Sequence, residues 1–515
     1  MPIRRMIRPV PRWWSGAEEP APRPAPDVGE VPVMAQQRTL VTGGHVVSMD
    51  PAIGDLPVGD VLVEDGVIVA VAPAVPAGDA EVVDATGHVV LPGLIDTHRH
   101  TWQSVVRGIC ADWTLGDYYF GIRLAISPAM TPEDVRLGQL VGGADALNAG
   151  VTTLLDFSHT NNTPDHFDAA VTGIRESGVR AAHCHGFFES RPAEPRFGTH
   201  ADRVRDFARL AERHFPGRDG LVTLGVSLSE VFGQPWQQTV EELTLAREYG
   251  ALVVNHTGCV WGSCVTGGIR ELDAAGLLGP DIVHVHCNTL DDDEWTALAR
   301  SGGKVSISVE TELNMGMGRP VFERCRRHGL APTLSADVIS LNSGDLWHQM
   351  RFGLGFDRWD ATHADNLAGR MPETVTTTAR DALTWTTVNA ADAMGMGDRI
   401  GSLTPGKRAD LVLVGGPSFE TSPRPDVVGS LVFQTTVADV RTVLVDGRVV
   451  KQDGVLVDHD LRALTRQAEA ACEGVLQRVA DNGQTLPGTP GNGWELMEPL
   501  FQANRPQPAA PAARS

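Results

Sequence analysis

The chain has 515 residues, of which 42% are hydrophobic and 21% are charged, values typical of a globular protein with room for two or more domains. Its net charge of −21 at pH 7 argues against a nucleic-acid partner or an anionic membrane surface. No apolar run is long enough to cross a bilayer. The seven cysteines are an odd number without a C-x-x-C pair, which argues against a disulfide framework and favours a cytoplasmic location.

The N-terminal region is poor in the apolar residues that a folded core needs. Residues 15–33 are rich in Pro, Ala and Glu, a composition typical of disorder. Arg4-Arg5 resembles a twin-arginine export signal, but Pro9 and Pro11 interrupt the apolar stretch that such a signal requires. We therefore expect residues 1–33 to form a disordered tail and the protein not to be exported.

Short β-prone runs occur near both ends of the chain. Asp65-Gly66 and Asp446-Gly447 each join two such runs, and Asp-Gly favours the tight turn of a β-hairpin. The two hairpin-rich pieces, 34–90 and 400–458, predict one small β-sandwich domain built from both ends of the chain.

Between these pieces, residues 91–399 alternate apolar strands with helical stretches. The expected strands are 89–96, 151–157, 179–185, 221–227, 251–256, 281–286, 304–308 and 333–337. Strands joined by helical crossovers over roughly 250 residues predict a (β/α)8 barrel of the TIM type. The alternative is an open doubly wound sheet, but no glycine-rich phosphate fingerprint follows any of the strands.

Several helices can be placed from their periodicity and their ends. The expected crossover helices include 131–147, 163–176, 201–214 and 290–301. Thr131-Pro132 and Thr163-Pro164 each offer an N-cap threonine followed by proline at the first helical position. Apolar residues at helical spacing from Leu461 to Val479 predict an amphipathic helix ending at Asn482-Gly483. Thus 459–515 should hold a C-terminal helix and then an irregular tail, since 484–515 is rich in Pro, Gly and Ala.

Polar residues at the C-terminal ends of barrel strands converge on one site. The residues at or just after the predicted ends are His98, His100, Asp156, His159, His183, His185, Ser227, Glu230, His256, His286, Glu310, Glu312 and Asp337. His98 and His100 point to the same face of their strand and can share a metal ion. Taken alone, His256 could be a core histidine and Asp337 a helix N-cap. Together, the three histidines and the aspartate form a site for Zn²⁺ or Fe²⁺ with an open position for water.

Four segments carry a family resemblance. They are P-G-L-I-D-T-H-R-H at 92–100, G-V-T-T-L-L-D at 150–156, H-C-N-T-L-D-D-D-E at 286–294 and G-S-L-T-P-G-K-R-A-D-L at 401–411. With these segments the chain resembles the amidohydrolase superfamily over roughly residues 36–458. It looks most like the branch that holds the guanine, cytosine and S-adenosylhomocysteine deaminases and the triazine hydrolases.

The resemblance implies roles for individual residues. It makes His98, His100, His256 and Asp337 metal ligands, and Asp337 also the base that takes the proton from the nucleophilic water. His286 becomes the strand-6 histidine that contacts this water or the substrate. Binuclear relatives carry a lysine at the end of strand 4, and segment 221–227 has none. We therefore expect one divalent transition metal per chain, Zn²⁺ first and Fe²⁺ as the alternative.

One position departs from the family pattern. Deaminases of this branch carry a glutamate three residues after the strand-5 histidine, and this chain has Cys259 there. A neutral thiol is a poor substitute for a carboxyl general acid. We assign Glu310 as the replacement acid and Glu312 to substrate binding, although both could also belong to a solvated loop. If no carboxylate replaces the missing glutamate, the reaction differs from ring deamination.

Further residues are candidates for the substrate pocket. They are Trp102, Gln103, Arg107 and His185, with Arg107 the expected contact for an anion or a carbonyl group. For His183 and His185, hydrogen bonding behind the metal ligands is favoured over metal ligation.

These observations predict a metal-dependent hydrolase of carbon–nitrogen bonds other than peptide bonds. Metal-bound hydroxide would attack a carbon bearing nitrogen in a small N-heterocycle, by a deaminase-like or cyclic amidohydrolase reaction. Because of Cys259, a dechlorinating hydrolase or a non-hydrolytic lyase on the same metal is the alternative. A binding protein without catalysis is disfavoured because the ligand set is intact. We expect a small-molecule substrate, no nucleic-acid or membrane partner, and a homo-oligomer, with a dimer favoured.

Overall fold

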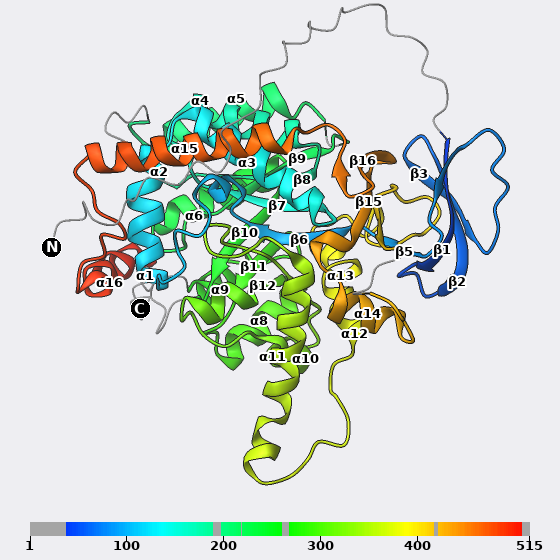
Figure 1. Ribbon diagram of the computed structural model, residues 1–515. Helices are drawn as coiled ribbons and strands as arrows, with labels where there is room; N and C mark the ends of the chain where they lie inside the picture. The colour runs from blue at the N-terminus through cyan, green and yellow to red at the C-terminus, as the bar shows by residue number, and fades with distance from the viewer. Residues whose placement is uncertain (1–37, 189–196, 218, 260–266, 417–420, 507–515) are drawn as a thin grey trace, which may run out of the picture. The chain divides into compact units, whose positions relative to one another are not determined.

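The computed structural model describes residues 38–188, 197–217, 219–259, 267–416 and 421–506. The predicted tail, 1–33, lies outside the described residues. Two β-sheets organise the described chain, an eight-stranded parallel sheet and a nine-stranded sheet (Figure 1).

The parallel sheet follows sequence order from its first strand to its last. Its strands are β6 (Leu94–Arg99), β7 (Val151–Ser158), β8 (Arg180–Gly186), β9 (Val222–Ser227), β10 (Leu252–Thr257), β11 (Ile282–His286), β12 (Lys304–Ile307) and β13 (Pro332–Leu334). The Asp337 amide donates to the His98 carbonyl at 2.9 Å, and the His100 amide donates to the Asp337 carbonyl at 3.0 Å. These two bonds join the last strand segment to the first, so the sheet is the predicted (β/α)8 barrel rather than an open sheet.

Helices connect and surround the strands (Figure 1). From the N-terminal side they are η2 (Thr101–Val106), α1 (Leu115–Tyr118), the π-helical turn η3 (Tyr119–Ile126), α2 (Ser127–Ala129), α3 (Pro132–Asn148), α4 (Pro164–Ser177), α5 (His200–His214), α6 (Trp236–Glu248) and α7 (Ile269–Ala274). They continue with α8 (Asp292–Ser301), α9 (Val309–Asn314), α10 (Phe322–His328), α11 (Leu346–Leu367), α12 (Ala379–Trp385), α13 (Val388–Ala393), α14 (Val427–Gln434) and η4 (Val437–Asp439).

The four crossover helices expected from sequence are confirmed as α3, α4, α5 and α8. Pro132 and Pro164 open α3 and α4 as predicted, but the threonines before them behave differently. Thr131 forms a capping box with Asp134, whereas the Thr163 hydroxyl contacts His166 Nδ1 at 2.7 Å and makes no cap.

The nine-stranded sheet contains strands from both ends of the chain, as predicted. They are β1 (Arg38–Val47), β2 (Asp55–Glu64), β3 (Val67–Ala72), β4 (Glu81–Asp84), β5 (His88–Pro92), β14 (Leu411–Gly415), β15 (Val440–Val445), β16 (Arg448–Gln452) and β17 (Val455–Leu456). β14 pairs with β5, which joins the C-terminal strands to the N-terminal ones. In Figure 1 the blue strands and the orange strands of this sheet come from opposite ends of the sequence.

A single strand over 89–96 was the wrong expectation. The segment divides at Gly93 into β5, which pairs in the nine-stranded sheet, and β6, which opens the barrel. A Cβ atom at Gly93 would lie 2.1 Å from Thr152 Oγ1, so only glycine allows the chain to pass here without displacing its neighbour.

The barrel interior changes character along its axis. An apolar cluster includes Ile95, Leu155 and Val283 of the strands and Ala390 of α13. Two residues beyond Ile95, the Thr97 hydroxyl lies 2.7 Å from Ser306 Oγ and 2.8 Å from Thr333 Oγ1. The histidines begin one residue later, so the polar site lies on a floor of bonded hydroxyl groups.

The C-terminal region is only partly as expected. The predicted amphipathic helix is confirmed as α15 (Leu461–Asp481), whose Val475 and Val479 pack with residues of η2 and α3. The prediction of an irregular 484–515 is wrong over α16 (Gly493–Asn504), which begins in the Pro- and Gly-rich segment.

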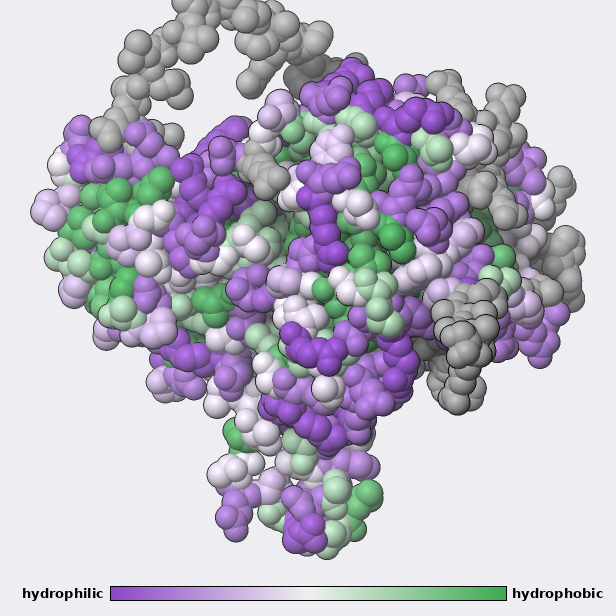
Figure 2. All heavy atoms as spheres, turned by 180° about the vertical axis from the view of Figure 1, so that it is seen from behind, coloured by the Kyte–Doolittle hydropathy of each residue, from purple (hydrophilic) through white to green (hydrophobic). Residues whose placement is uncertain are grey.

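The face shown in Figure 2 is mixed in character, with hydrophilic residues predominating between smaller hydrophobic patches. Among the described residues, no helix is both long and apolar enough to cross a membrane.

Candidate metal centre and substrate pocket

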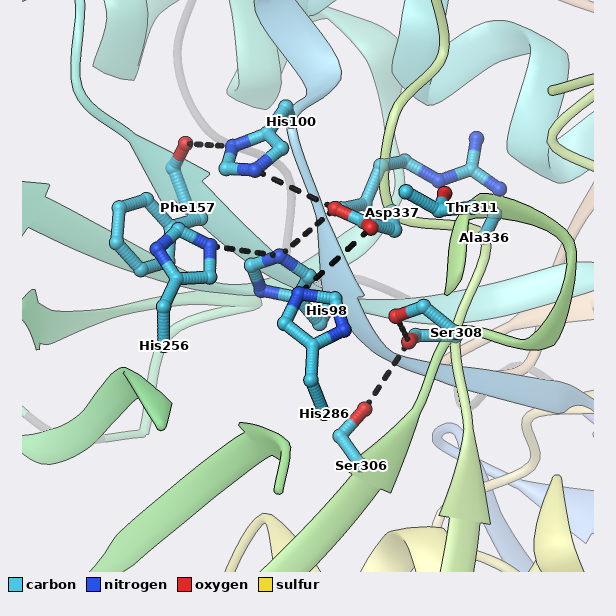
Figure 3. A network of polar contacts seen from close by, with 12 residues as sticks. His98, His100, Phe157, His256, His286, Ser306, Ser308, Thr311, Ala336 and Asp337 are labelled. Atoms are coloured by element: carbon cyan, nitrogen blue, oxygen red, sulfur yellow. Dashed lines mark hydrogen bonds and ion pairs between the residues drawn. The ribbon is translucent and has the colours of Figure 1, made fainter. Parts of the chain in front are cut away.

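The predicted metal ligands lie together at the C-terminal ends of the barrel strands (Figure 3). His98 Nε2 lies 3.0 Å from Asp337 Oδ1, and His100 Nε2 lies 3.4 Å from the same oxygen. His256 Nε2 lies 3.3 Å from His98 Nε2, and His286 Nε2 lies 3.9 Å from Asp337 Oδ2. Strands β6, β10 and β11 and the turn after β13 therefore bring five side chains that could bind a metal close together.

Three of the four imidazoles hold their Nδ1 atom against an oxygen behind them. The pairs are His100 Nδ1 with the Phe157 carbonyl at 3.3 Å, His256 Nδ1 with Glu230 Oε1 at 3.0 Å and His286 Nδ1 with Glu312 Oε1 at 3.1 Å. Such contacts place the proton on Nδ1 and fix the ring orientation. The Nε2 lone pairs of His100 and His256 are then directed at the common point, which is the arrangement that a metal site requires.

Two residues of the site, His286 and Asp337, have an unusual backbone conformation. His286 has φ +76° and Asp337 has φ +56°, in the left-handed region that side chains other than glycine rarely adopt. Such conformations cost about 1–3 kcal/mol each and persist where the surroundings enforce them. At Asp337 the two hydrogen bonds that close the barrel provide that constraint, and they also direct its carboxylate toward the histidines.

Burial and charge set the protonation states of the site. Burial lowers the pKa of His98 to about 4, even though the Asp337 carboxylate favours the protonated ring. Burial also lowers the pKa of His100 well below its usual value. For Asp337, burial opposes ionisation, but the hydrogen bond and charge of His98 outweigh it and bring the pKa to about 2. Neutral imidazoles and an ionised carboxylate are the forms that bind a metal.

The donor set fits a divalent transition metal. The His98 and His256 Nε2 atoms, 3.3 Å apart, turn lone pairs toward each other and repel unless a proton or a cation lies between them. Asp337 Oδ2 is buried and has no hydrogen-bond partner among the described residues. Nitrogen ligands with one carboxylate suit Zn²⁺ or Fe²⁺.

A cavity adjoins this cluster. Its wall contains candidate ligands, two tyrosines, two further charged side chains and several apolar residues. The lining residues are His100, Leu115, Tyr118, Tyr119, Arg123, His159, Glu230, His256, Cys259, His286, Thr311, Met317, Asp337, Val338, Met497 and Phe501.

Comparisons with known proteins agree with this architecture. A family model described as the amidohydrolase family matches residues 89–450. The chain belongs to the amidohydrolase family. A 5-methylthioadenosine/S-adenosylhomocysteine deaminase of Symbiobacterium thermophilum is 30% identical over 440 residues, which cover 81% of this chain and 94% of the relative. A 5'-deoxyadenosine deaminase of Methanosarcina barkeri is 28% identical over 458 residues, which cover 85% and 99%.

Solved structures show the same fold. An adenosine deaminase from Xanthomonas campestris with bound zinc superposes with a TM-score of 0.74 at 24% identity, covering 85% of this chain and 98% of that one. An atrazine chlorohydrolase from Arthrobacter aurescens complexed with zinc gives a TM-score of 0.71 at 20% identity, covering 84% and 100%. The protein is thus a metal-dependent hydrolase of carbon–nitrogen bonds, as its sequence predicts.

Within this amidohydrolase, all five residues predicted to bind substrate, Trp102, Gln103, Arg107, His185 and Glu312, lie outside the pocket lining. Trp102 Nε1 donates to His159 Nδ1 at 2.9 Å, and Gln103 Nε2 donates to the Tyr118 hydroxyl at 2.8 Å. Both side chains are fully buried and support residues that do line the pocket. Arg107 forms an ion pair with Asp145, and His185 is buried against the rings of Phe167 and Phe207.

The two candidate acids of strand 7 do not share a face. The strand ends at Ile307, and α9 begins at Val309, so residues two apart project in different directions. Glu312 lies behind His286, whereas Glu310 Oε2 accepts from Gln349 Nε2 of α11 at 2.9 Å. Both carboxylates could point into the site only if the strand continued through residues 310–312, and it ends at Ile307.

The pocket also contains residues to which no role could be assigned from sequence. Glu230 lies three residues after β9, and this position near a strand end is the sequence signal that could have pointed to the site. Arg123 lies in η3, a π-helical turn that no periodic pattern announces. Met497 and Phe501 belong to α16, in a segment whose composition indicates no helix.

Proposed function

We propose that the protein is a mononuclear zinc hydrolase that removes an amino group from a small N-heterocycle. The observation that carries the proposal is the convergence of Asp337 with the ring nitrogens of four histidines beside one cavity, which three of these histidines and Asp337 line. The deaminases among its relatives support the same reaction type. The cytoplasmic location and the dimer expected from sequence stay predictions.

His98, His100, His256 and Asp337 would hold the metal, with His286 facing the same point. A divalent metal bound by these residues lowers the pKa of a coordinated water toward neutrality. The protein contributes by holding its own side chains in fixed positions. The Nδ1 contacts fix three of the rings before any ligand arrives, so little reorganisation is needed in the reaction.

Asp337 and His286 are placed to handle the proton of the attacking water. Asp337 is ionised and its Oδ2 has no partner among the described residues, so this oxygen can accept a proton. Burial disfavours the protonated form of His286, but its hydrogen bond to Glu312 and the charge of Asp337 outweigh burial and raise its pKa. His286 Nε2 can therefore donate a hydrogen bond to the substrate.

Glu230 takes the role that Cys259 cannot fill. Both side chains line the cavity, and Glu230 Oε2 is buried without a hydrogen-bond partner among the described residues. Burial opposes ionisation of Glu230, but the charge and hydrogen bond of His256 outweigh it and lower the pKa. The resting carboxylate can thus accept a proton and pass it from Oε2 to the leaving nitrogen. Glu230 replaces Glu310 in this assignment because Glu310 lies against α11.

The test is an assay of zinc-loaded protein with 5'-deoxyadenosine, 5'-methylthioadenosine, S-adenosylhomocysteine, cytosine, guanine and amino- and chlorotriazines. We expect ammonia release with replacement of an amino group by oxygen, seen by mass spectrometry. Chelator-treated protein and Asp337→Asn serve as controls. Chloride release without ammonia from any amino compound would reject deamination in favour of halide displacement, the alternative that Cys259 raises.

A further inference from the structure

Arg123 combines a fixed position, nearly complete burial and a place in the pocket wall. It lies in the π-helical turn η3, and its side chain is 3% exposed. The same cavity is lined by the candidate ligands His100, His256 and Asp337. π-Helical turns are frequent at functional sites, because the extra residue redirects side chains. A guanidinium group therefore shares one enclosed space with the reacting centre.

One edge of this guanidinium meets no acceptor in the described part of the chain. Arg123 Nε and Nη2 are buried and have no hydrogen-bond partner among the described residues. Elsewhere in the chain the same pair of nitrogens holds a carboxylate side-on. Arg180 Nε and Nη2 donate to the two oxygens of Asp410 at 2.6 Å and 3.0 Å. Arg247 Nε and Nη2 donate to Asp281 at 2.8 Å and 3.2 Å. Arg123 has the same pair of donors, and no described residue supplies the acceptor.

The protein orients Arg123 but does not neutralise it. The guanidinium carbon lies 3.8 Å from the centre of the Phe188 ring, a stacking contact that uses the face of the group and not the hydrogen-bond donors at its edge. No carboxylate of the described residues lies within ion-pair distance of Arg123, and the nearby Glu230 is hydrogen bonded to His256. Leaving a buried charge without a partner is strongly unfavourable. A ligand that supplies the acceptor removes this penalty.

We propose that Arg123 binds a carboxylate of the substrate side-on through Nε and Nη2, so that the substrate is an acid rather than a neutral heterocycle. The inference rests on the proposed function only for the part of the substrate that reacts. It assigns the two ends of the ligand, with the carbon that bears nitrogen toward Asp337 and the carboxylate toward η3. Lysine can substitute only in part, because its ammonium group keeps the charge but lacks the planar fork.

The test measures binding, using unreactive probe pairs in which an acetyl group of similar shape replaces the carboxylate, so that the charge and one acceptor oxygen are removed. Nicotinate is compared with 3-acetylpyridine, and quinoline-3-carboxylate with 3-acetylquinoline, by calorimetric titration of zinc-loaded protein. The variants are Arg123→Gln and Arg123→Lys, with Arg247→Gln as the matched control, because it removes an arginine whose edge is already filled. Zinc content and circular dichroism establish that each variant is folded.

We expect the wild type and Arg247→Gln to bind each acid roughly 10- to 100-fold more tightly than its ketone, the range for bidentate charge-assisted bonds. Arg123→Gln should reduce this preference to about threefold or less, and Arg123→Lys should retain only part of it. If Arg123→Gln kept the full preference, the acid would be binding to the metal, and the proposal would be wrong. Equal affinities, or no binding of either acid, in the wild type would also reject it.

Because these probes carry no leaving group, the result is independent of turnover. A protein that binds acids through Arg123 but releases no ammonia from any substrate would reject the proposed function and leave this inference standing. A protein that releases ammonia but has no preference for acids would reject this inference and leave the proposed function standing.

Discussion

The two ends of the pocket are built in different ways. The inner end consists of residues at the ends of barrel strands, and the hydrogen bonds of Asp337 to the first strand fix their positions. The outer end consists of η3 and α16, which belong to no sheet. Met497 and Phe501 of α16 reach the cavity, and Phe501 is buried against Val231 and Phe232. The reacting centre thus depends on the barrel, and the outer wall depends on a segment beyond residues 89–450 of the family match.

Local contacts hold α16 against the rim. Asn504 Nδ2 donates to the Phe232 carbonyl at 2.8 Å, and Arg505 lies 3.5 Å from Glu271 and over the Phe232 ring. Because the two ends of the pocket are built from different segments, we expect that chemistry and substrate selection can be changed separately in this chain. Mutations at the inner end should act on turnover or metal content, and mutations at the outer end should act on KM.

The largest effect is expected at Asp337. Asp337→Asn should reduce turnover roughly 10³-fold, because the variant loses the oxygen that accepts the proton, while part of the metal remains bound. His256→Ala should lose more metal, since it removes a neutral nitrogen ligand without a replacement. Turnover and elemental analysis of both variants check this. Nearly normal turnover of metal-loaded Asp337→Asn would show that Asp337 is not the base.

Glu230 and Glu310 form a matched pair for the next prediction. Glu230→Gln should reduce turnover about 10²-fold with unchanged metal content, because the proton can no longer pass to the leaving nitrogen. Glu310→Gln should change turnover less than about threefold, since its carboxylate bonds Gln349 away from the cavity. The rate of ammonia release measures the turnover of both variants. The opposite order of effects would restore the strand-7 acid that the sequence suggested.

The difference between the two ends of the pocket also explains which site residues could be predicted from the sequence. His98, His100, His256 and Asp337 were found because alternating strands and barrel topology place strand ends together. Glu310 was misjudged because the chain turns into α9 one residue after the strand, where spacing of two no longer means a shared face. Arg123 and Phe501 could not be found, because their positions depend on packing between segments far apart in the chain.

Removing the outer wall should affect binding more than chemistry. A chain ending at Gly483 lacks α16 and should raise KM about tenfold, with smaller changes in kcat, because Met497 and Phe501 no longer cover the substrate. Phe501→Ala should change KM in the same direction by a smaller factor. Zinc content serves as the control and should stay unchanged. Loss of zinc together with α16 would show that the two ends are not independent.

A buried carboxylate beneath the Glu230 loop predicts a pH effect on stability. Glu242 accepts from the Ser229 amide at 2.9 Å and from its hydroxyl at 2.8 Å. Burial raises its pKa to about 7, although these bonds favour ionisation. A raised carboxyl pKa stabilises the fold below the unfolded pKa, near 4.5, and this stability is lost as pH rises toward 7.

Glu242→Gln should therefore gain about 1–2 kcal/mol relative to wild type when the pH is raised from about 5 to 8, since the amide carries no charge at either pH. Urea unfolding at both pH values measures the difference. If both proteins showed the same pH dependence, Glu242 would be ionised at little cost in the folded state.

The smallest effect is expected at Arg107, the arginine that the sequence placed in the pocket. Its guanidinium pairs with Asp145 at 3.1 Å, and both side chains are about one-third exposed. Such partly exposed pairs contribute about 0–1 kcal/mol to stability, and this one lies outside the cavity lining. Arg107→Gln should therefore change KM and kcat less than about threefold. A large rise in KM would mean that Arg107 leaves Asp145 to reach the substrate, and that the outer wall rearranges when substrate binds.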